Sequence, residues 1–496
     1  MRNPVISRTT TRSLVAAAVL LACAGAQAAA TIKITSRDPA GVGFNDPTPA
    51  APVGGNPGKT LGEQRLFVYQ YVAAIWEQNL DSKVPITVSA GWEALECDAS
   101  SAVLGSAGAW NIWHDTPGAK PNRWYPQALA NKLAGENLSA DYDTGEGYDA
   151  VDIKTQFNVN LGNADCLSGS PFYLGVDGNA GSKVNFVETL LHELGHGLGF
   201  SITSTHSQYG YRINAEGTSY VASGGVPSVW EDYMYDNTSR NTWTNLTTAQ
   251  RQRSAINALG LAWNGKNAVE GAKMLARIPI LQSTSPAPNG NLNIDYNTSS
   301  FGPLPPATGM LGTLAVVATQ AGETGPGCDA FNAANTTAVK GKVALVSRGV
   351  CSFAIKVKNA QNAGAVGVVL VNNAAGALVP GGTDGTVTIP SVGITQVDGE
   401  KLKTAVSSAV ALGTRSKPGL VTINLATDPT RIAGADASGR PLLYTPATFA
   451  SGSSVSHWDV TASPNLLMEP NINPDLGTIL VAPKDLTVPL LKDIGW

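Results

Sequence analysis

The sequence is poor in charged residues. Only 14% of its 496 residues are charged, and the formal net charge is -4. A surface that binds nucleic acid or anionic lipid carries a concentrated excess of Lys and Arg, and the composition holds no such excess. We therefore exclude nucleic acid as an expected partner, while the composition leaves the oligomeric state open.

Long apolar runs are also absent after the N-terminus. Residues 1–28 carry three arginines, an apolar run over 14–22 and the small-x-small site Ala26-Gln27-Ala28, the pattern of a secretory signal peptide. No later segment approaches the roughly 20 apolar residues of a transmembrane helix. We expect a secreted protein, with a lipid anchor on Cys23 as the minority alternative, because Leu20-Leu21-Ala22-Cys23 is similar to a lipoprotein box.

Cysteines are few as well. Removal of residues 1–28 leaves Cys97, Cys166, Cys328 and Cys351, and an even number in an exported chain favours two disulfides. The two clusters lie far apart and, as argued below, fall in different domains. We therefore predict that Cys97 pairs with Cys166 and Cys328 with Cys351.

Helix and strand patterns alternate in the first half of the chain. A Thr60-x-x-Glu63 capping box precedes apolar residues at three- and four-residue steps, which predict a helix over 61–80. Strands are expected at 84–88 and within 149–160. A further helix begins near 185 and should end at Gly197 or Gly199, because glycine commonly caps helix C-termini. This order predicts an α+β layout.

The character of the sequence changes near residue 275. Residues 282–306 are rich in Pro, Ser, Asn and Gly, which marks a boundary. Beyond it, residues 341–373 show a strand, a helix and a second strand whose apolar run, 366–371, is typical of a strand buried on both faces. The sequence therefore predicts a separate α/β module in the middle of the chain.

A metal-binding pattern lies on the helix expected from residue 185. His192-Glu193-Leu194-Gly195-His196 is an H-E-x-x-H sequence, and residues four apart share one face of a helix. Both imidazoles can therefore reach one zinc ion. Zinc lowers the pKa of a bound water, and Glu193 is close enough to take its proton as general base.

The third zinc ligand is not on this helix. Gly199 continues the metzincin signature H-E-x-x-H-x-x-G-x-x-H, but its final position is Ile202. A catalytic zinc normally has three protein ligands and an open position for water. The remaining candidates are His206, the carboxylate pair Glu231/Asp232, and His457.

His457 is the favoured candidate. Met468 follows eleven residues later, in the Leu-Met-x-Pro sequence at 467–470. In metzincins a methionine turn follows the third ligand and lies beneath the metal, so a His with a Met soon after it is the expected context.

The stretches HELGHGLGF (192–200), SHWD (456–459) and NLLMEP (465–470) together resemble the leishmanolysin-type metallopeptidases. In that family an insertion separates the third histidine from the helix. The resemblance implies His192, His196 and His457 as ligands of one catalytic zinc, Glu193 as catalytic base and Met468 as turn methionine. It also implies a metzincin-like zincin fold and zinc endopeptidase activity on proteins or peptides.

The module in the middle of the chain resembles a second family. GKVALVSRGVCSFAIKVKNAQNAGAVGVVLVNN (341–373), followed by TIPSVGIT (388–395), is similar to the protease-associated (PA) domain of secreted peptidases, which is noncatalytic. The expected organisation is a signal peptide (1–28), the first part of a catalytic zincin domain (29–274), an inserted PA domain with linkers (275–430), and the second catalytic part with a C-terminal helix (431–496).

Two further expectations concern function and other ions. The alternative from another class is a noncatalytic zinc-containing binding protein, a PA module on a pseudo-peptidase scaffold; the intact Glu193 favours the enzyme. The loop GVDGNAG (175–181) has oxygen donors of the kind that calcium prefers. Glycine-rich turns carry such donors by default, so a structural calcium is unsupported, and no other cofactor is expected.

Overall fold

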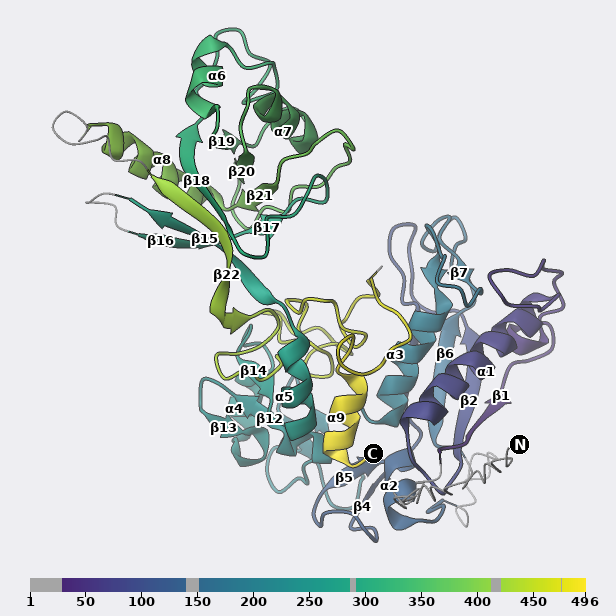
Figure 1. Ribbon diagram of the computed structural model, residues 1–496. Coiled ribbons are helices and arrows are strands. Elements are labelled where there is room, and N and C mark those ends of the chain that lie inside the picture. Colours follow the sequence, from purple (N-terminus) through teal and green to yellow (C-terminus); the bar gives the residue numbers. More distant parts are fainter. Residues whose placement is uncertain (1–28, 140–150, 286–290, 412–420, 474) are drawn as a thin grey trace, which may run out of the picture.

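The computed structural model describes residues 29–139, 151–285, 291–411, 421–473 and 475–496. The predicted signal peptide and Cys23 lie outside the described residues. Figure 1 shows two bodies joined by a pair of strands: one contains both the N-terminal and C-terminal parts of the described chain, and the other contains its middle.

A sheet with the strand order β1-β2-β6-β3 forms the framework of the first body within the described residues. Its first three strands are parallel, and β3 runs antiparallel at the edge beside β6. The strands expected at 84–88 and 149–160 correspond to β2 and β6. The four strands are β1 (Ile32–Ser36), β2 (Ile86–Glu93), β3 (Gly105–Ala109) and β6 (Ile153–Asn158).

Helices α1 and α3 lie side by side on one face of this sheet (Figure 1). Helix α1 (Leu61–Asn79) begins where the capping box predicted, because the Thr60 side chain accepts a hydrogen bond from the Glu63 amide. Between helices and sheet, the rings of Tyr69, Phe157 and Phe186 pack edge-on or tilted against one another. This aromatic cluster fixes α3 against the sheet.

Helix α3 (Phe186–Leu198) carries the H-E-x-x-H sequence, and its ends obey local rules. The Asn185 side chain caps its N-terminus by accepting from the Val187 amide. Gly199 has φ +119 and closes the C-terminus, so the helix ends at the second of the two predicted glycines. Gly195 allows a close approach: a Cβ there would lie 2.8 Å from the Met468 sulfur.

Smaller elements complete the first body. The C-terminal helix expected in the closing segment is α9 (Thr487–Ile494), which packs against α5 (Figure 1). The others are β4 (Ile112–His114), β5 (Trp124–Pro126), α2 (Gln127–Ala134), β7 (Phe172–Tyr173), β8 (Val184–Asn185), β9 (Thr205–His206), β10 (Tyr211–Ile213), β11 (Tyr220–Val221), β12 (Met234–Asp236), β13 (Asn241–Thr242), α4 (Thr248–Ser254), β14 (Leu261–Trp263) and α5 (Lys266–Gly271), with short 3-10 turns at Gly43–Asn45, Val229–Asp232, Trp243–Asn245 and Ala272–Met274.

The second body is built on one mixed sheet, ordered β16-β15-β22-β18-β19-β20-β21-β17 in the described residues. The strand, helix and strand expected within 341–373 are β19, α7 and β20, and β20 is buried along its whole length. The elements are β15 (Arg277–Thr284), β16 (Leu292–Asp295), β17 (Asn297–Thr298), β18 (Met310–Val316), α6 (Ala333–Val339), β19 (Val343–Ser347), α7 (Phe353–Asn362), β20 (Gly367–Val371), β21 (Ser391–Ile394), α8 (Gln396–Ala411) and β22 (Thr422–Ile432).

The two bodies have separate cores. The main apolar cluster draws its buried residues from 30–275 and 443–496, whereas the other two clusters lie wholly within 281–425. At the junction Arg277 of β15 pairs with Ile432 of β22, and the Ala433 amide donates to the Ala276 carbonyl at 2.9 Å. The chain thus leaves and re-enters the first body at adjacent points.

This junction makes excision of the second body testable. Replacing residues 278–431 with a short Gly/Ser turn should leave the first body folded, because Ala276 and Ala433 already lie hydrogen-bonded to each other and no core is shared. A retained cooperative thermal transition and an unchanged near-UV circular dichroism signal from the buried tryptophans would agree. Loss of the cooperative transition would show that the two bodies depend on each other.

The four cysteines pair as the sequence predicts. Disulfides join Cys97 to Cys166 in the first body and Cys328 to Cys351 in the second, with Cα atoms 5.0 and 5.7 Å apart. Among the described helices, none combines the length and apolar character needed to cross a membrane.

Candidate metal centre

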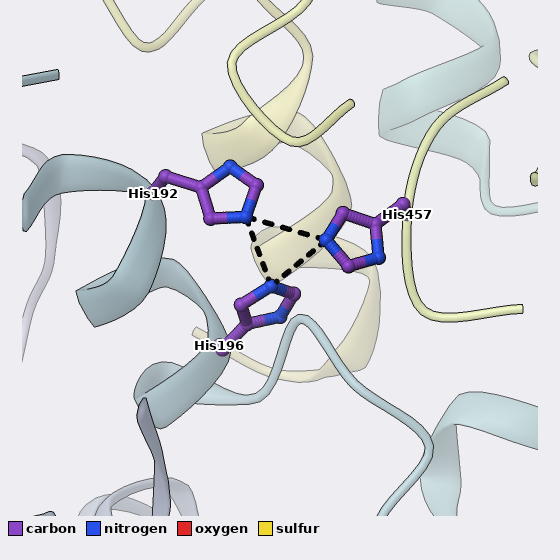
Figure 2. Close-up of side chains that lie close together, drawn as sticks. All are labelled: His192, His196 and His457. Carbon is purple, nitrogen blue, oxygen red and sulfur yellow. Dashed lines mark hydrogen bonds between the residues drawn. The ribbon is translucent and has the colours of Figure 1, made fainter. Parts of the chain in front are cut away.

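Three histidines from two distant parts of the chain converge on one point. His192 and His196 project from α3, and His457 comes from the loop after the second body (Figure 2). Their Nε2 atoms are 3.1, 3.2 and 3.3 Å apart. Within the described residues, this is the group of three or more His, Cys, Asp or Glu side chains able to hold a metal ion.

Backbone carbonyls set the tautomer of each ring. The Nδ1 atom of His192 lies 2.7 Å from the Leu467 oxygen, and that of His196 lies 2.7 Å from the Phe200 oxygen. The Nδ1 atom of His457 lies 2.9 Å from the Ser453 oxygen. A carbonyl oxygen only accepts hydrogen bonds, so each Nδ1 donates and carries the ring proton. Each neutral ring therefore directs an Nε2 lone pair toward the other two.

This arrangement fits a cation. Burial lowers the pKa of His192 to about 4 and that of His196 to about 3, and it holds the pKa of His457 well below its ordinary value. All three rings are therefore neutral near pH 7, as metal ligands must be. Tetrahedral zinc with bonds of about 2.0–2.1 Å to histidine nitrogen places its ligand atoms about 3.3–3.4 Å apart, close to the spacing here.

Glu193 follows His192 on α3, and its side chain is buried. Burial raises its pKa to about 8, and a hydrogen bond from the Ala107 backbone on β3 opposes that rise. A carboxylate with a raised pKa is a stronger base than a solvated glutamate. A cation held by the neighbouring imidazoles would favour the ionised carboxylate, which is the form that can accept a proton.

The turn around Met468 contacts His192 and the residue next to His457. The Leu467 carbonyl receives the Nδ1 proton of His192, and the Met468 carbonyl receives the amide of Trp458, next to His457. The Leu467 amide donates to the fully buried carboxylate of Asp485 at 2.8 Å. One short turn therefore fixes the positions of His192 and His457 relative to each other.

The other candidates for the third ligand lie elsewhere. His206 is exposed on β9, where its ring packs against Tyr209. Glu231 is buried in an ion pair with Arg212 at 2.6 Å. Asp232 pairs with Lys120 and Arg123. None of the three belongs to the histidine group.

Several supporting contacts have no signal in the sequence. The carbonyls of Leu467, Phe200 and Ser453 are backbone groups, so residue types do not reveal them. Asp485 lies in the closing segment with no motif around it, and Ala107 is one small residue in a Gly/Ala strand. Folding alone brings these groups to the site.

A comparison with protein families identifies part of the second body. Residues 311–402 match the PA domain family. The second body contains a PA domain. The match covers the strand-helix-strand segment on which the sequence resemblance rested, and the other residues of the chain fall outside it.

Several curated relatives are peptidases that share a short stretch with this chain. Leucine aminopeptidase 2 of Trichophyton rubrum is 38% identical over 117 residues, which is 23% of this chain and 22% of the relative. The PII-type proteinase of Lactococcus lactis subsp. cremoris is 45% identical over 67 residues, 14% of this chain and 4% of the relative. The chain thus spans about a fifth or less of the length of these relatives.

The solved structures that align with this chain are only weakly similar to it. A zinc aminopeptidase from Bacillus subtilis aligns at 24% identity and a TM-score of 0.21, covering 32% of this chain and 34% of that one. The curated relatives named here are peptidases, and each shares only a short stretch with this chain. The named relatives are aminopeptidases and proteinases rather than leishmanolysins, so the leishmanolysin-type catalytic domain stays a prediction.

Proposed function

We propose that this protein is a secreted zinc endopeptidase of the leishmanolysin-like, metzincin type. His192, His196 and His457 hold one zinc ion, Glu193 is the general base and Met468 is the turn methionine. Export follows from the leader predicted in residues 1–28, and the two disulfides suit an oxidising compartment.

The convergence of the three Nε2 lone pairs is the observation that carries this proposal. Three neutral acceptors 3.1–3.3 Å apart, with no proton between them, repel one another unless a cation lies among them. Their three Nδ1 protons are already held by carbonyls, so rotation of the rings would break these hydrogen bonds. The centre is therefore preorganised for a metal with nitrogen ligands.

The residues around the metal have defined roles in peptide hydrolysis. A zinc ion bound here would supply a Lewis acid that polarises a carbonyl and makes water more acidic. Glu193 takes the proton of the attacking water and later gives it to the departing amine. Its buried position keeps this proton from exchanging freely with solvent.

The edge strand β3 offers a place for the substrate backbone. In the described sheet β3 has β6 on one side only, and its Ala107 backbone contacts Glu193. An extended peptide can add to such an edge through main-chain hydrogen bonds. We propose that the substrate lies along β3, which would bring its peptide bonds close to Glu193.

Metal analysis and a paired activity assay test the proposal. The purified protein should contain one zinc per chain and should degrade casein, and a chelator should remove both properties. Hydrolysis of leucine p-nitroanilide without casein degradation would instead indicate an aminopeptidase, the activity named in the relatives. Bound zinc with no hydrolysis of either substrate would favour the noncatalytic binding protein.

Asp485 should influence zinc affinity through the turn that it supports. In Asp485→Ala the amides of Leu467 and Thr487 lose their carboxylate partner, and the Leu467 carbonyl can no longer be held firmly against His192. We expect zinc affinity to fall about tenfold, since partners outside the ligand shell commonly contribute 10- to 100-fold. Competition with a chromogenic chelator measures the change.

Asp493→Ala is the matched control. Asp493 is another buried carboxylate at α9, but it accepts hydrogen bonds from Trp263 and the Ala268 amide rather than from the methionine turn. The Asp493→Ala variant should have a lower thermal stability and an unchanged zinc affinity. Equal losses of zinc affinity in both variants would mean that Asp485 acts only through general stability.

A further inference from the structure

An exposed aromatic surface lies on the small sheet formed by β9, β10 and β11. Tyr209, Tyr211 and Tyr220 are 47, 38 and 46% exposed, and they are the aromatic members among the exposed large hydrophobic side chains of the described residues. His206 joins them, with ring centroids 4.6 Å from Tyr209 and 5.6 Å from Tyr220. We call these four side chains the tyrosine platform.

Strand pairing explains why the rings share one face. Tyr211 on β10 lies opposite His206 on β9, and Ile213 lies opposite Tyr220 on β11. Side chains at alternate positions of a strand and directly opposite one another across strands point to the same side. The intervening Arg212 is buried on the other side.

The buried side of this sheet is held by a charged network. The Glu231 carboxylate accepts from Arg212 at 2.6 Å and from the Thr205 hydroxyl at 2.6 Å. Arg251, which is also buried, donates to the carbonyl of Gly210, the residue between Tyr209 and Tyr211. The network fixes the backbone under the platform, so the rings are presented without a large ordering cost on binding.

The platform is joined to the histidine centre by a short, anchored segment. His196 contacts the Phe200 carbonyl, and the Ile202 amide donates to the Ser456 hydroxyl beside His457. From His196 to His206 the chain is ten residues, so the Cα atoms of these two residues are at most about 36 Å apart at about 3.6 Å per residue. An extended substrate of about ten residues can bridge that distance.

The chemistry of the platform favours an uncharged occupant. Residues 199–225 contain only Arg212 and Glu216 as charged residues; Arg212 is buried, and Glu216 lies in the turn beyond β10. Tyrosine combines a large apolar ring with a hydroxyl that can hydrogen-bond, at a low cost in side-chain entropy, and is common where polypeptides are recognised.

We propose that the tyrosine platform is a secondary binding site for an uncharged, extended stretch of the polypeptide substrate, outside the catalytic centre. The proposal rests on the peptidase function proposed above, because the anchored segment between the two sites links the platform to a centre that acts on polypeptides. Such a site selects long or unfolded protein substrates over short peptides, which cannot reach both places.

Binding by an inactive protein tests the platform separately from catalysis. In a Glu193→Gln background, fluorescence anisotropy with labelled, unfolded casein gives a Kd, and the variant Tyr209→Ser/Tyr211→Ser/Tyr220→Ser should raise it about tenfold or more. In the active protein the same triple change should raise KM for casein and leave kcat/KM for a short peptide unchanged. The matching Tyr→Phe triple variant should retain most of the affinity, since the rings remain.

Ile256→Ser is the control, because it also removes an exposed apolar side chain from the first body; Ile256 is 40% exposed. This variant should bind casein as tightly as the parent protein. An unaltered Kd in the triple serine variant would overturn the proposal, as would tyrosine-dependent binding to a soluble cellulose derivative in place of casein. Casein binding that depends on the tyrosines, in a protein whose active form hydrolyses no peptide, would support the platform and refute the peptidase.

Discussion

Glu193→Gln should bind zinc as tightly as the parent protein and hydrolyse peptides about 10²- to 10⁴-fold more slowly, the range that general acid-base catalysis contributes. The substitution preserves shape and removes only the basic group. The three imidazoles keep their carbonyl partners, so metal binding does not depend on the change. Zinc content by atomic absorption, together with kcat for a chromogenic peptide, measures both expectations.

Glu188→Gln provides the matched control on the same helix. Glu188 lies five residues earlier on α3, is 8% exposed, and has a pKa raised by burial to about 6. It therefore resembles Glu193 in burial and helix context, but its carboxylate interacts with Asn185 and Asp475 rather than with Ala107 of β3. Activity near the parent level in Glu193→Gln, or an equal loss in Glu188→Gln, would refute the assigned role of Glu193.

His457→Ala should lose zinc and activity together. Removal of its ring leaves two ligands, and Trp458, beside it, still holds the Met468 carbonyl. The variant should therefore fold while its zinc affinity falls by several orders of magnitude, because the remaining protein nitrogens no longer enclose the ion. Chelator competition and near-UV circular dichroism distinguish loss of metal from loss of fold.

His206→Ala is the corresponding control, because the sequence offered His206 as an alternative ligand. Its ring lies on the exposed face of β9 among tyrosines, so the variant should keep zinc and short-peptide hydrolysis. If His206→Ala loses the metal and His457→Ala keeps it, the proposed ligand set is wrong.

Local patterns predicted the elements that local physics controls. The capping box predicted the start of α1, and the glycine signal placed the end of α3 at one of two residues. The continuous apolar run at 366–371 predicted the buried strand β20, and the PA domain match confirms the resemblance of that segment.

By itself, the sequence determined that two histidines share one face of a helix with Glu193 between them, because four residues complete about one helical turn. It also determined that a distinct α/β module interrupts the chain. Only the tertiary structure brings His457, rather than His206, Glu231 or Asp232, to His192 and His196, since His196 and His457 are 261 residues apart and no local rule relates them. The same is true of the ring tautomers, the burial of Glu193 and the tyrosine platform. Each depends on carbonyls, strands and buried charges that meet only when separate segments pack together.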